Sequence, residues 1–212
     1  MKKQLEIDII DKNRFNELIR YEHYLHRVNS TKPAIQYQIT YDRQIVAIME
    51  WSAIFKPVLL RFPFLQHYEI IDNSRFLIRK EWELFERPIE IYNLGSRSMS
   101  MGIKQVRLDW QNISGYLPKL LISYVDCSKG YTGTVYRASN WREIEESAGK
   151  NYNQRAKKDY KPTPKKTFIY PLIKTFHIQP VTFFDKQFLR DHWDIMNPVA
   201  QYNYRPHEQK TS

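Results

Sequence analysis

The amino-acid sequence predicts an α/β protein built on a mixed central β-sheet with helices on its faces. Two observations favour this class: β-branched and aromatic runs of strand length recur along the chain, and segments with helical spacing lie between them. The chain has 212 residues, of which 42% are hydrophobic, so it can bury the core of one ordinary domain. We expect this domain over residues 1–174, with an acidic insertion at about 81–90, a basic segment at 150–166 and a C-terminal extension at 175–212.

A helix and a hairpin open the predicted fold. Residues 11–27 carry apolar side chains three and four positions apart, which predicts an amphipathic helix with Asp11 or Asn13 as its N-cap. Residues 34–41 and 44–54 are strand-like runs joined by a tight polar turn. This arrangement predicts an antiparallel hairpin.

Strands alternate with turn–helix units in the rest of the chain. The apolar run Phe76-Leu77-Ile78 predicts a short central strand, and the polar residues 72–75 introduce it, with Asn73 compatible with a turn. The remaining predicted elements are a helix at 99–110, a strand at 121–125, a helix at 134–140, strands at 141–145 and 167–172, and a short helix at 185–193.

The stretch from residue 120 to residue 141 is the predicted centre of the functional site. Asp126 directly follows the strand, and a glycine-punctuated turn comes next. Tyr136 and Asn140 are four residues apart, so they share one face of the following helix. Ligands of α/β sheets bind at the carboxyl ends of strands, and we therefore expect chemistry here.

A small polar turn precedes the helix predicted at 99–110. Such a turn leaves backbone N–H groups free to hold a phosphate group. The alternative is that Ser96 or Ser98 is a plain helix cap. The candidate phosphate-binding residues are Asn93, Gly95, Ser96, Arg97 and Ser98.

The charge of the chain indicates an anionic partner such as nucleic acid. Lysine and arginine number 33 against 23 aspartates and glutamates, a formal net charge of +10. Residues 150–166 hold seven of these cations against one acid, with tyrosines interleaved. Such a segment can neutralise phosphates and stack on bases, although a solvated loop has the same composition. The predicted DNA contacts here are Lys150, Arg155, Lys157 and Lys158.

Other features bound the class of protein. The single cysteine, Cys127, and the lack of a long apolar run predict a cytoplasmic protein with no membrane partner, in the host cytoplasm if a phage encodes the chain. No paired histidine or cysteine spacing predicts a metal site. His23 lies in the first predicted helix, and a lone histidine there is either structural or catalytic.

Four segments together resemble two known families. Over residues 21–172 they are similar to the Druantia A family, which is found in anti-phage defence loci and beside transposases. The Ser-Tyr-x-Asp, glycine-turn and Tyr-x-Ala-x-Asn core also resembles the phage Mom proteins. The segments are residues 73–78, residues 93–97 with 109–110, residues 123–126 and residues 133–141.

The Mom resemblance implies a GNAT-like fold. It also implies an enzyme that converts adenine in DNA to a carbamoylmethyl derivative and so protects the DNA from restriction. In this resemblance Asp126 and Tyr136 are catalytic, and the Druantia A pattern adds His23. The turn at 93–98 stands where GNAT proteins bind the pyrophosphate of an acyl-CoA, although the usual glycine-rich signature is missing from it.

The implied reaction requires adenine to leave the base stack and to lie against an aromatic ring such as Tyr124, Tyr131 or Trp141. Asp126 would serve as base or acceptor for the amine, and Tyr136 as a proton donor. Two other functions stay open: a non-catalytic DNA-binding component of a defence or transposon system, and an acyltransferase acting on a small molecule or RNA. The remaining candidate contacts to DNA or cofactor are Arg75, Arg97, Arg137 and Asn140.

Overall fold

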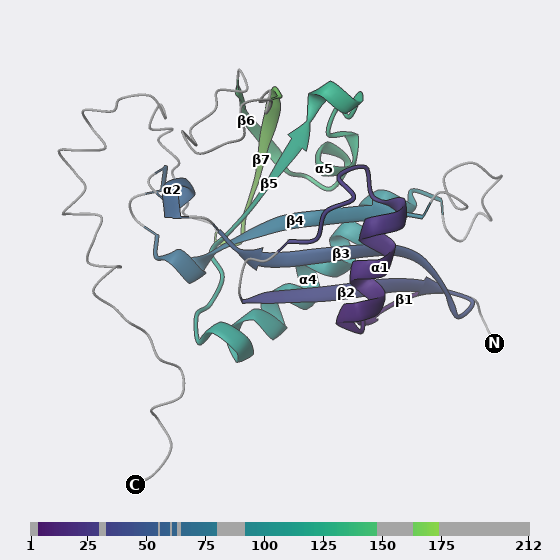
Figure 1. The fold of residues 1–212 in the computed structure, drawn as a ribbon. Coiled ribbons are helices and arrows are strands. Elements are labelled where there is room, and N and C mark those ends of the chain that lie inside the picture. Colours follow the sequence, from purple (N-terminus) through teal and green to yellow (C-terminus); the bar gives the residue numbers. More distant parts are fainter. Residues whose placement is uncertain are drawn as a thin grey trace, which may run out of the picture.

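The computed structural model describes residues 4–29, 33–54, 56–59, 61–62, 65–79, 92–147 and 163–173. Seven described strands form one sheet in the order β1-β2-β3-β4-β5-β7-β6 (Figure 1). β4 and β5 pair in parallel, and the other neighbours pair antiparallel. The strands are β1 (Leu5–Ile9), β2 (Ala34–Tyr41), β3 (Gln44–Ala53), β4 (Ile70–Ile78), β5 (Leu120–Asp126), β6 (Arg142–Ser147) and β7 (Lys165–Pro171). The helices are α1 (Lys12–Glu22), α2 (Lys56–Leu59), α4 (Leu94–Ser114) and α5 (Thr134–Ala138), with short 3₁₀ turns at His67–Glu69 and Cys127–Lys129.

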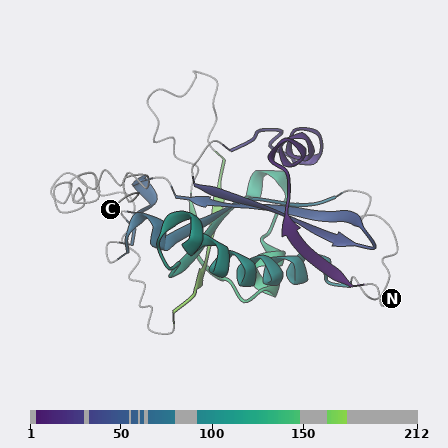
Figure 2. The same ribbon diagram turned by 90° about the horizontal axis from the view of Figure 1, so that it is seen from below.

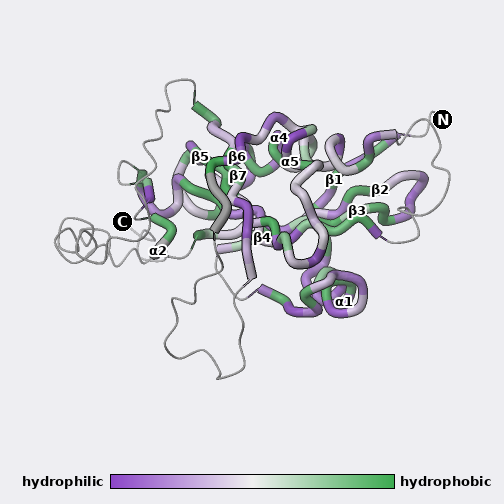
Figure 3. The backbone as a smooth tube through the Cα atoms, turned by 90° about the horizontal axis from the view of Figure 1, so that it is seen from above, coloured by the Kyte–Doolittle hydropathy of each residue, from purple (hydrophilic) through white to green (hydrophobic). Residues whose placement is uncertain are grey.

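Helices lie on both faces of the sheet (Figure 2). α1 packs on one face through Phe15, Leu18 and Ile19, which are buried together with Ile48 of β3 and Leu77 of β4. Hydrophobic segments run along β2 and β3, whereas α1 shows a mixture of hydrophobic and hydrophilic residues (Figure 3). This mixture is expected of a helix that buries one stripe and leaves the other in solvent.

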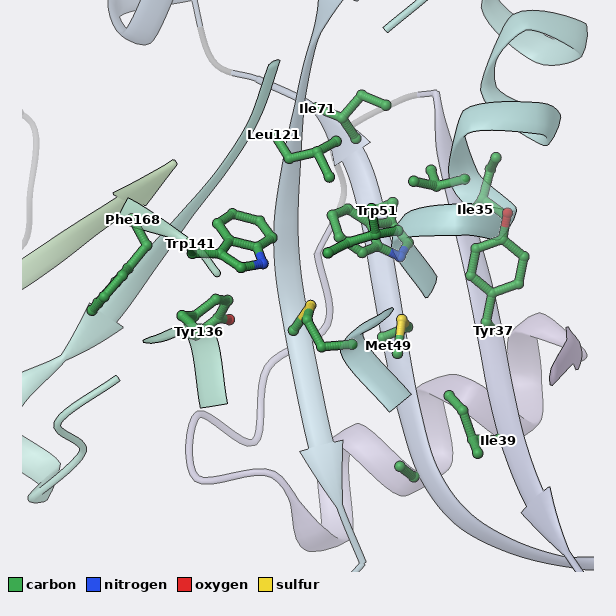
Figure 4. Close-up of a cluster of buried hydrophobic side chains, with 14 of the residues drawn as sticks. Ile35, Tyr37, Ile39, Met49, Trp51, Ile71, Leu121, Tyr136, Trp141 and Phe168 are labelled. Atoms are coloured by element: carbon green, nitrogen blue, oxygen red, sulfur yellow. The ribbon is translucent and has the colours of Figure 1, made fainter. Parts of the chain in front are cut away.

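α4 covers the opposite face, over the largest hydrophobic cluster (Figure 4). Gly102 allows α4 to lie close to β3, because a Cβ atom at this position would stand 2.1 Å from Sδ of Met49. Trp51 and Trp110 are fully buried in this layer. The indole nitrogen of Trp110 donates a hydrogen bond to the carbonyl of Tyr68 at 2.8 Å, which ties α4 to the chain before β4.

The predicted hairpin is confirmed. β2 and β3 pair antiparallel, and Asp42 and Arg43 join them with positive φ values of 52° and 66°. Two successive residues with positive φ are typical of a type I′ turn, whose twist matches that of the two strands of a hairpin. The strand, turn and helix predicted across 120–141 are confirmed as β5, a glycine turn and α5, and the later strands as β6 and β7.

Three boundaries differ from the sequence prediction. α1 ends at Glu22 instead of residue 27, because His23 is already extended. β4 begins at Ile70, so residues 72–75 are part of the strand and Asn73 does not make a turn. α4 begins at Leu94, five residues before the predicted start.

The strand β1 was not predicted. It lies at the edge of the sheet and pairs with β2 alone, and Leu5 is the one residue of β1 classed as buried. The acidic insertion, residues 150–162 of the basic segment and residues 174–212 with their predicted helix lie outside the described residues. The domain boundary at residue 174 therefore stays a prediction.

Candidate active site

The sheet opens between β4 and β5. Their parallel pairing covers Ile70 with Leu120, Ile71 with Leu121 and Asp72 with Ile122, and no pair follows. A cavity of about 510 Å³ lies along this β4–β5 opening, within the range of small-ligand sites. Its lining comes from the end of α1 and the chain after it (22–24 and 26), β4 (73–78), the end of β5 (124–126), and the glycine turn with the start of α5 (130–136).

A buried hydrogen-bond network stands where the two strands part. Tyr136 of α5 donates from its hydroxyl to Oδ1 of Asn73 at 2.9 Å, and Ser123 Oγ lies 2.8 Å from the same hydroxyl. Ser123 Oγ also lies 3.0 Å from the carbonyl oxygen of Asn73. These side-chain hydrogen bonds therefore join β4 and β5 at the first position where the two strands no longer pair through their backbones. Burial raises the pKa of Tyr136, so this hydroxyl stays protonated.

Asp126 ends β5 and lines the cavity. Its Oδ1 accepts hydrogen bonds from the backbone nitrogen of Ser128 at 3.0 Å and from Ser128 Oγ at 2.6 Å. Its Oδ2 accepts from Thr163 Oγ1 at 3.0 Å. Burial would raise the pKa of Asp126, but these hydrogen bonds and the charge of Lys165 outweigh it and hold the pKa below its usual value. The carboxyl is therefore an ionised acceptor at neutral pH.

His23 follows α1 and is buried at the edge of the cavity. Its Nδ1 accepts a hydrogen bond from the backbone nitrogen of Leu25 at 3.2 Å, which leaves the proton of the neutral ring on Nε2. Burial, together with the charges of Arg75 and His26, lowers the pKa of His23 to about 4. His23 is therefore a neutral hydrogen-bond donor near pH 7. The ring of Tyr24 stacks on it at 4.5 Å.

The described arginine candidates already contact protein groups. Arg75 donates from Nε and Nη2 to the carbonyl oxygen of Arg27, at 3.1 and 2.9 Å, and so ties the chain after α1 to β4. Arg137 forms an ion pair with Glu143 and lies over the Phe168 ring at 5.4 Å. Arg75 lines the cavity, whereas Arg137 lies outside its lining.

The aromatic candidates separate into two groups. Tyr124 and Tyr131 line the cavity, and Tyr131 is 48% exposed. Trp141 is 4% exposed and packs in the core against Trp51, with ring centroids 6.3 Å apart (Figure 4). The prediction that Trp141 stacks on a base is therefore corrected, because other side chains cover its ring. Asn140 is exposed with a φ of 64° and lies outside the cavity lining.

The five residues predicted to hold a pyrophosphate lie at the beginning of α4. None of Asn93, Gly95, Ser96, Arg97 and Ser98 lines the cavity. Two cavity residues stand beside Gly95, because a Cβ atom there would meet Val135 Cγ2 at 2.9 Å and Ile78 Cδ1 at 3.2 Å. Ser98 is fully buried. These residues do not fit a diphosphate site continuous with the cavity, and Gly95 serves the packing of α4 against α5 and β4.

Glu50 of β3 centres a buried polar network that the sequence did not reveal. Glu50 is 1% exposed and accepts hydrogen bonds from Gln36 Nε2 and Ser74 Oγ, each at 2.7 Å. Successive side chains of a strand point to opposite faces of the sheet, and Glu50 lies on the face opposite α4. A bulge in β4 opposite Glu50 directs both Ser74 and Arg75 to the face that carries α1.

Asp72 lies on the same face, at the last pair before the β4–β5 opening. Its Oδ1 is buried without a hydrogen-bond partner in the part of the chain that the structure describes. Burial raises the pKa of Asp72 to about 7, with a further rise from Glu50 and an opposing effect of Arg75 and Lys165. No sequence signal pointed to this residue, because residues 72–75 were predicted to precede the strand and not to lie within it.

The described residues contain no cluster of metal ligands and no membrane-spanning helix. No three His, Cys, Asp or Glu side chains among them lie close enough together to hold a metal ion. None of the described helices is long and apolar enough to cross a membrane. Lys150, Arg155, Lys157 and Lys158 lie outside the described residues, so their contact with DNA stays a prediction.

Solved structures confirm the GNAT-like fold. The ribosomal-protein-S18-alanine N-acetyltransferase from Escherichia coli is similar with a TM-score of 0.52 and 8% identity, over 82% of this chain and 99% of that one. A spermidine N-acetyltransferase mutant from Vibrio cholerae has a TM-score of 0.52 and 7% identity, over 79% and 94%. A Bacillus subtilis acetyltransferase in complex with CoA has a TM-score of 0.50 and 7% identity, over 81% and 100%. At these identities the likeness shows the fold alone.

The family comparison is more specific. No curated protein matches the chain. The resemblance to the Druantia A family stays a prediction, whereas the resemblance to Mom proteins is confirmed. The model of the Mom protein family matches residues 4–168, which include β1 to β5, the β4–β5 opening and α5. The chain therefore belongs to the Mom protein family, whose members have a GNAT-like fold and modify adenine in DNA.

Proposed function

We propose that this chain is a transferase that adds an acyl or carbamoylmethyl-type group to the exocyclic amine of adenine in DNA, at the β4–β5 opening. One observation carries the proposal: an ionised carboxylate, Asp126, lines the cavity of a chain whose family modifies adenine. The net charge of +10 supports DNA as the partner.

Asp126 is the proposed acceptor for the amine. The amine of adenine is a weak nucleophile because its lone pair is delocalised into the ring. A carboxylate that accepts one N–H bond orients this lone pair towards the donor carbon. As the new N–C bond forms and the leaving group departs with its electron pair, the nitrogen becomes far more acidic. Asp126 then takes the proton in spite of its low pKa.

Tyr136 is proposed to position the site. Its only hydroxyl proton is given to Asn73, so it does not donate to a leaving group without breaking that bond. We infer instead that Tyr136 fixes the width of the β4–β5 opening. His23, as a neutral Nε2–H donor, is the proposed group that hydrogen-bonds to a ring nitrogen or a developing negative charge.

The proposed donor is an acyl-CoA or a related activated acyl compound. The support is the fold, which a CoA complex shares. CoA would supply a thioester with a good leaving group. Since residues 93–98 do not form a diphosphate site continuous with the cavity, we assign no residue of this chain to the donor.

The test is nucleoside mass spectrometry on DNA from cells that express the parent protein or Asp126→Asn. We expect an added mass on adenine with the parent and none with the variant, in which an amide oxygen can still accept the hydrogen bonds of Ser128. Asp8→Asn, which removes an exposed carboxylate on β1, is the matched control and should modify DNA normally. Unmodified adenine in DNA from cells expressing the parent would refute the proposal.

A further inference from the structure

We propose that Tyr24 and Tyr131 form the binding site of the extruded adenine, with Tyr24 as the fixed face and Tyr131 as the movable one. The inference rests on the proposed function, because it names where the base substrate of that reaction binds. The two rings contact each other at the cavity, with centroids 5.1 Å apart and planes tilted by 50°. They come from distant parts of the chain, Tyr24 from the segment directly after α1 and Tyr131 from the glycine turn after β5.

Tyr24 is held from several directions. Its ring stacks on His23 at 4.5 Å with an angle of 29° between the planes. The backbone nitrogen of His26 donates to the carbonyl of His23 at 2.8 Å, which closes a tight turn around Tyr24. The guanidinium of Arg75 binds the carbonyl of Arg27 with two N–H groups and anchors the end of this turn to β4. A half-buried ring in such a frame is a preorganised stacking surface.

Tyr131 is the more exposed ring of the pair. It is 48% exposed and is the one described Phe, Tyr or Trp residue of the cavity lining in the exposed class. Gly130 precedes it with a φ of 77°, and no atom lies within 4 Å of the place where its Cβ would be. Because it is 48% exposed, Tyr131 is the ring of the pair that can move away from Tyr24 into solvent. A flat base can then enter between the rings, since both faces of a nucleobase stack on aromatic side chains.

The position of Asp126 links this pair to the chemistry. Burial raises the pKa of Tyr24 to about 12, and the negative charge of Asp126 adds to the rise. Tyr24 and Asp126 line the same cavity. A base stacked on Tyr24 would therefore lie in the cavity that Asp126 also lines. Tyr136 offers no such face, because it is 9% exposed and its ring stacks on Phe168 at 5.3 Å.

Binding to two single strands tests the site. One probe is oligodeoxyadenylate with an end label, and the other is a strand of equal length built from abasic sites, which offers the same phosphates without bases. Fluorescence anisotropy at one salt concentration gives both affinities for the parent protein, Tyr24→Ala, Tyr24→Phe and Tyr131→Ala. Tyr21→Ala is the matched control, because Tyr21 lies on α1 three residues earlier, is 76% exposed and does not line the cavity.

We expect Tyr24→Ala to weaken oligodeoxyadenylate binding by about 5- to 150-fold and to leave the abasic strand unaffected. Tyr24→Phe keeps the stacking face and should bind as the parent does. Tyr131→Ala, an exposed position at which folding is not at stake, should weaken binding in the same direction. Parent-like binding of oligodeoxyadenylate by both alanine variants, or an equal loss with Tyr21→Ala or on the abasic strand, would overturn the inference.

Adenine analysis of cellular DNA separates this inference from the proposed function. If the parent and Tyr24→Ala modify adenine to the same extent, the base site is wrong and the function stands. If the parent modifies no adenine while base-dependent binding still requires Tyr24, the function is wrong and the base site stands.

Discussion

Replacement of Asp72 by asparagine should make the protein more stable as the pH rises from 4 to 7, whereas the parent should change little. The reason is that two buried groups oppose each other in this pH range. Asp72 keeps its proton in the folded state up to about pH 7, and His23 stays neutral down to about pH 4. As the pH rises, Asp72 therefore lowers the stability of the parent and His23 raises it.

The sizes of the two effects follow from their pKa values. Burial raises the pKa of Asp72 from its ordinary value of 3.8 to about 7. The contribution of Asp72 to stability is therefore fully present below pH 3.8 and is lost as the pH rises through 7. At about 1.4 kcal/mol for each pH unit between the two values, the loss is at most about 4 kcal/mol. The pKa of His23 falls from 6.5 to about 4. The contribution of neutral His23 to stability is therefore present above pH 6.5 and is lost as the pH falls through 4. This amounts to at most about 3 kcal/mol.

Urea unfolding at pH 4, 5.5 and 7 measures the difference, because buried tryptophans such as Trp51 and Trp110 report on folding by fluorescence. As the pH rises from 4 to 7, the free energy of unfolding of Asp72→Asn should increase relative to that of the parent by up to about 4 kcal/mol. Asp8→Asn reports the effect of removing an exposed carboxylate. A constant difference between Asp72→Asn and the parent at all three pH values would refute the reasoning, because a constant offset reflects packing or hydrogen bonding alone.

Three further predictions concern the site and its frame. Tyr136→Phe leaves the buried Oδ1 of Asn73 without its donor and should cost about 1–3 kcal/mol in urea unfolding; an unchanged midpoint would contradict the network. Gly133→Ala should lower the melting temperature far more than Gly130→Ala, because both have positive φ but only at Gly133 would a Cβ meet the Phe168 ring, at 2.3 Å; equal effects would contradict the close packing. Duplex DNA affinity should fall steeply, by about 10³-fold or more, between about 50 and 200 mM salt, and a flat response would count against DNA as the partner.

The parts of the fold that were predictable are those encoded locally. The β2–β3 hairpin has two strand-like runs around a polar turn, and the β5–α5 unit has an apolar run followed by glycines. The sequence of β1, Leu5-Glu6-Ile7-Asp8-Ile9, alternates apolar and acidic residues and was the available signal, but the run is only five residues long and its pairing with β2 is not visible in the sequence. The early end of α1 at Glu22 left no pattern, since apolar spacing continues beyond it.

The candidate site was predictable to the extent that it follows a strand end. Asp126 lies in the cavity because it ends β5, and the sequence places an acid there. Asn73, Ser123 and Tyr24 were missed as members of the site because their partners are far away in sequence. The contact between Ser123 and Asn73 spans 50 residues, and that between Tyr136 and Asn73 spans 63. Polar residues inside strand-like runs were the one available signal, and they give no indication of their partners.

The network of Asn73, Ser123 and Tyr136 has a consequence for how the catalytic candidates should be compared. It stands where β4 and β5 lose their backbone pairing, so it stabilises the fold and shapes the cavity together. Loss of activity in Tyr136→Phe therefore does not distinguish a chemical effect from a wider opening. Ser123→Ala makes this distinction, because it breaks the same network and Ser123 does not line the cavity. If both variants lose activity in proportion to stability, Tyr136 acts by holding the strands, and Asp126 alone carries the proton transfer.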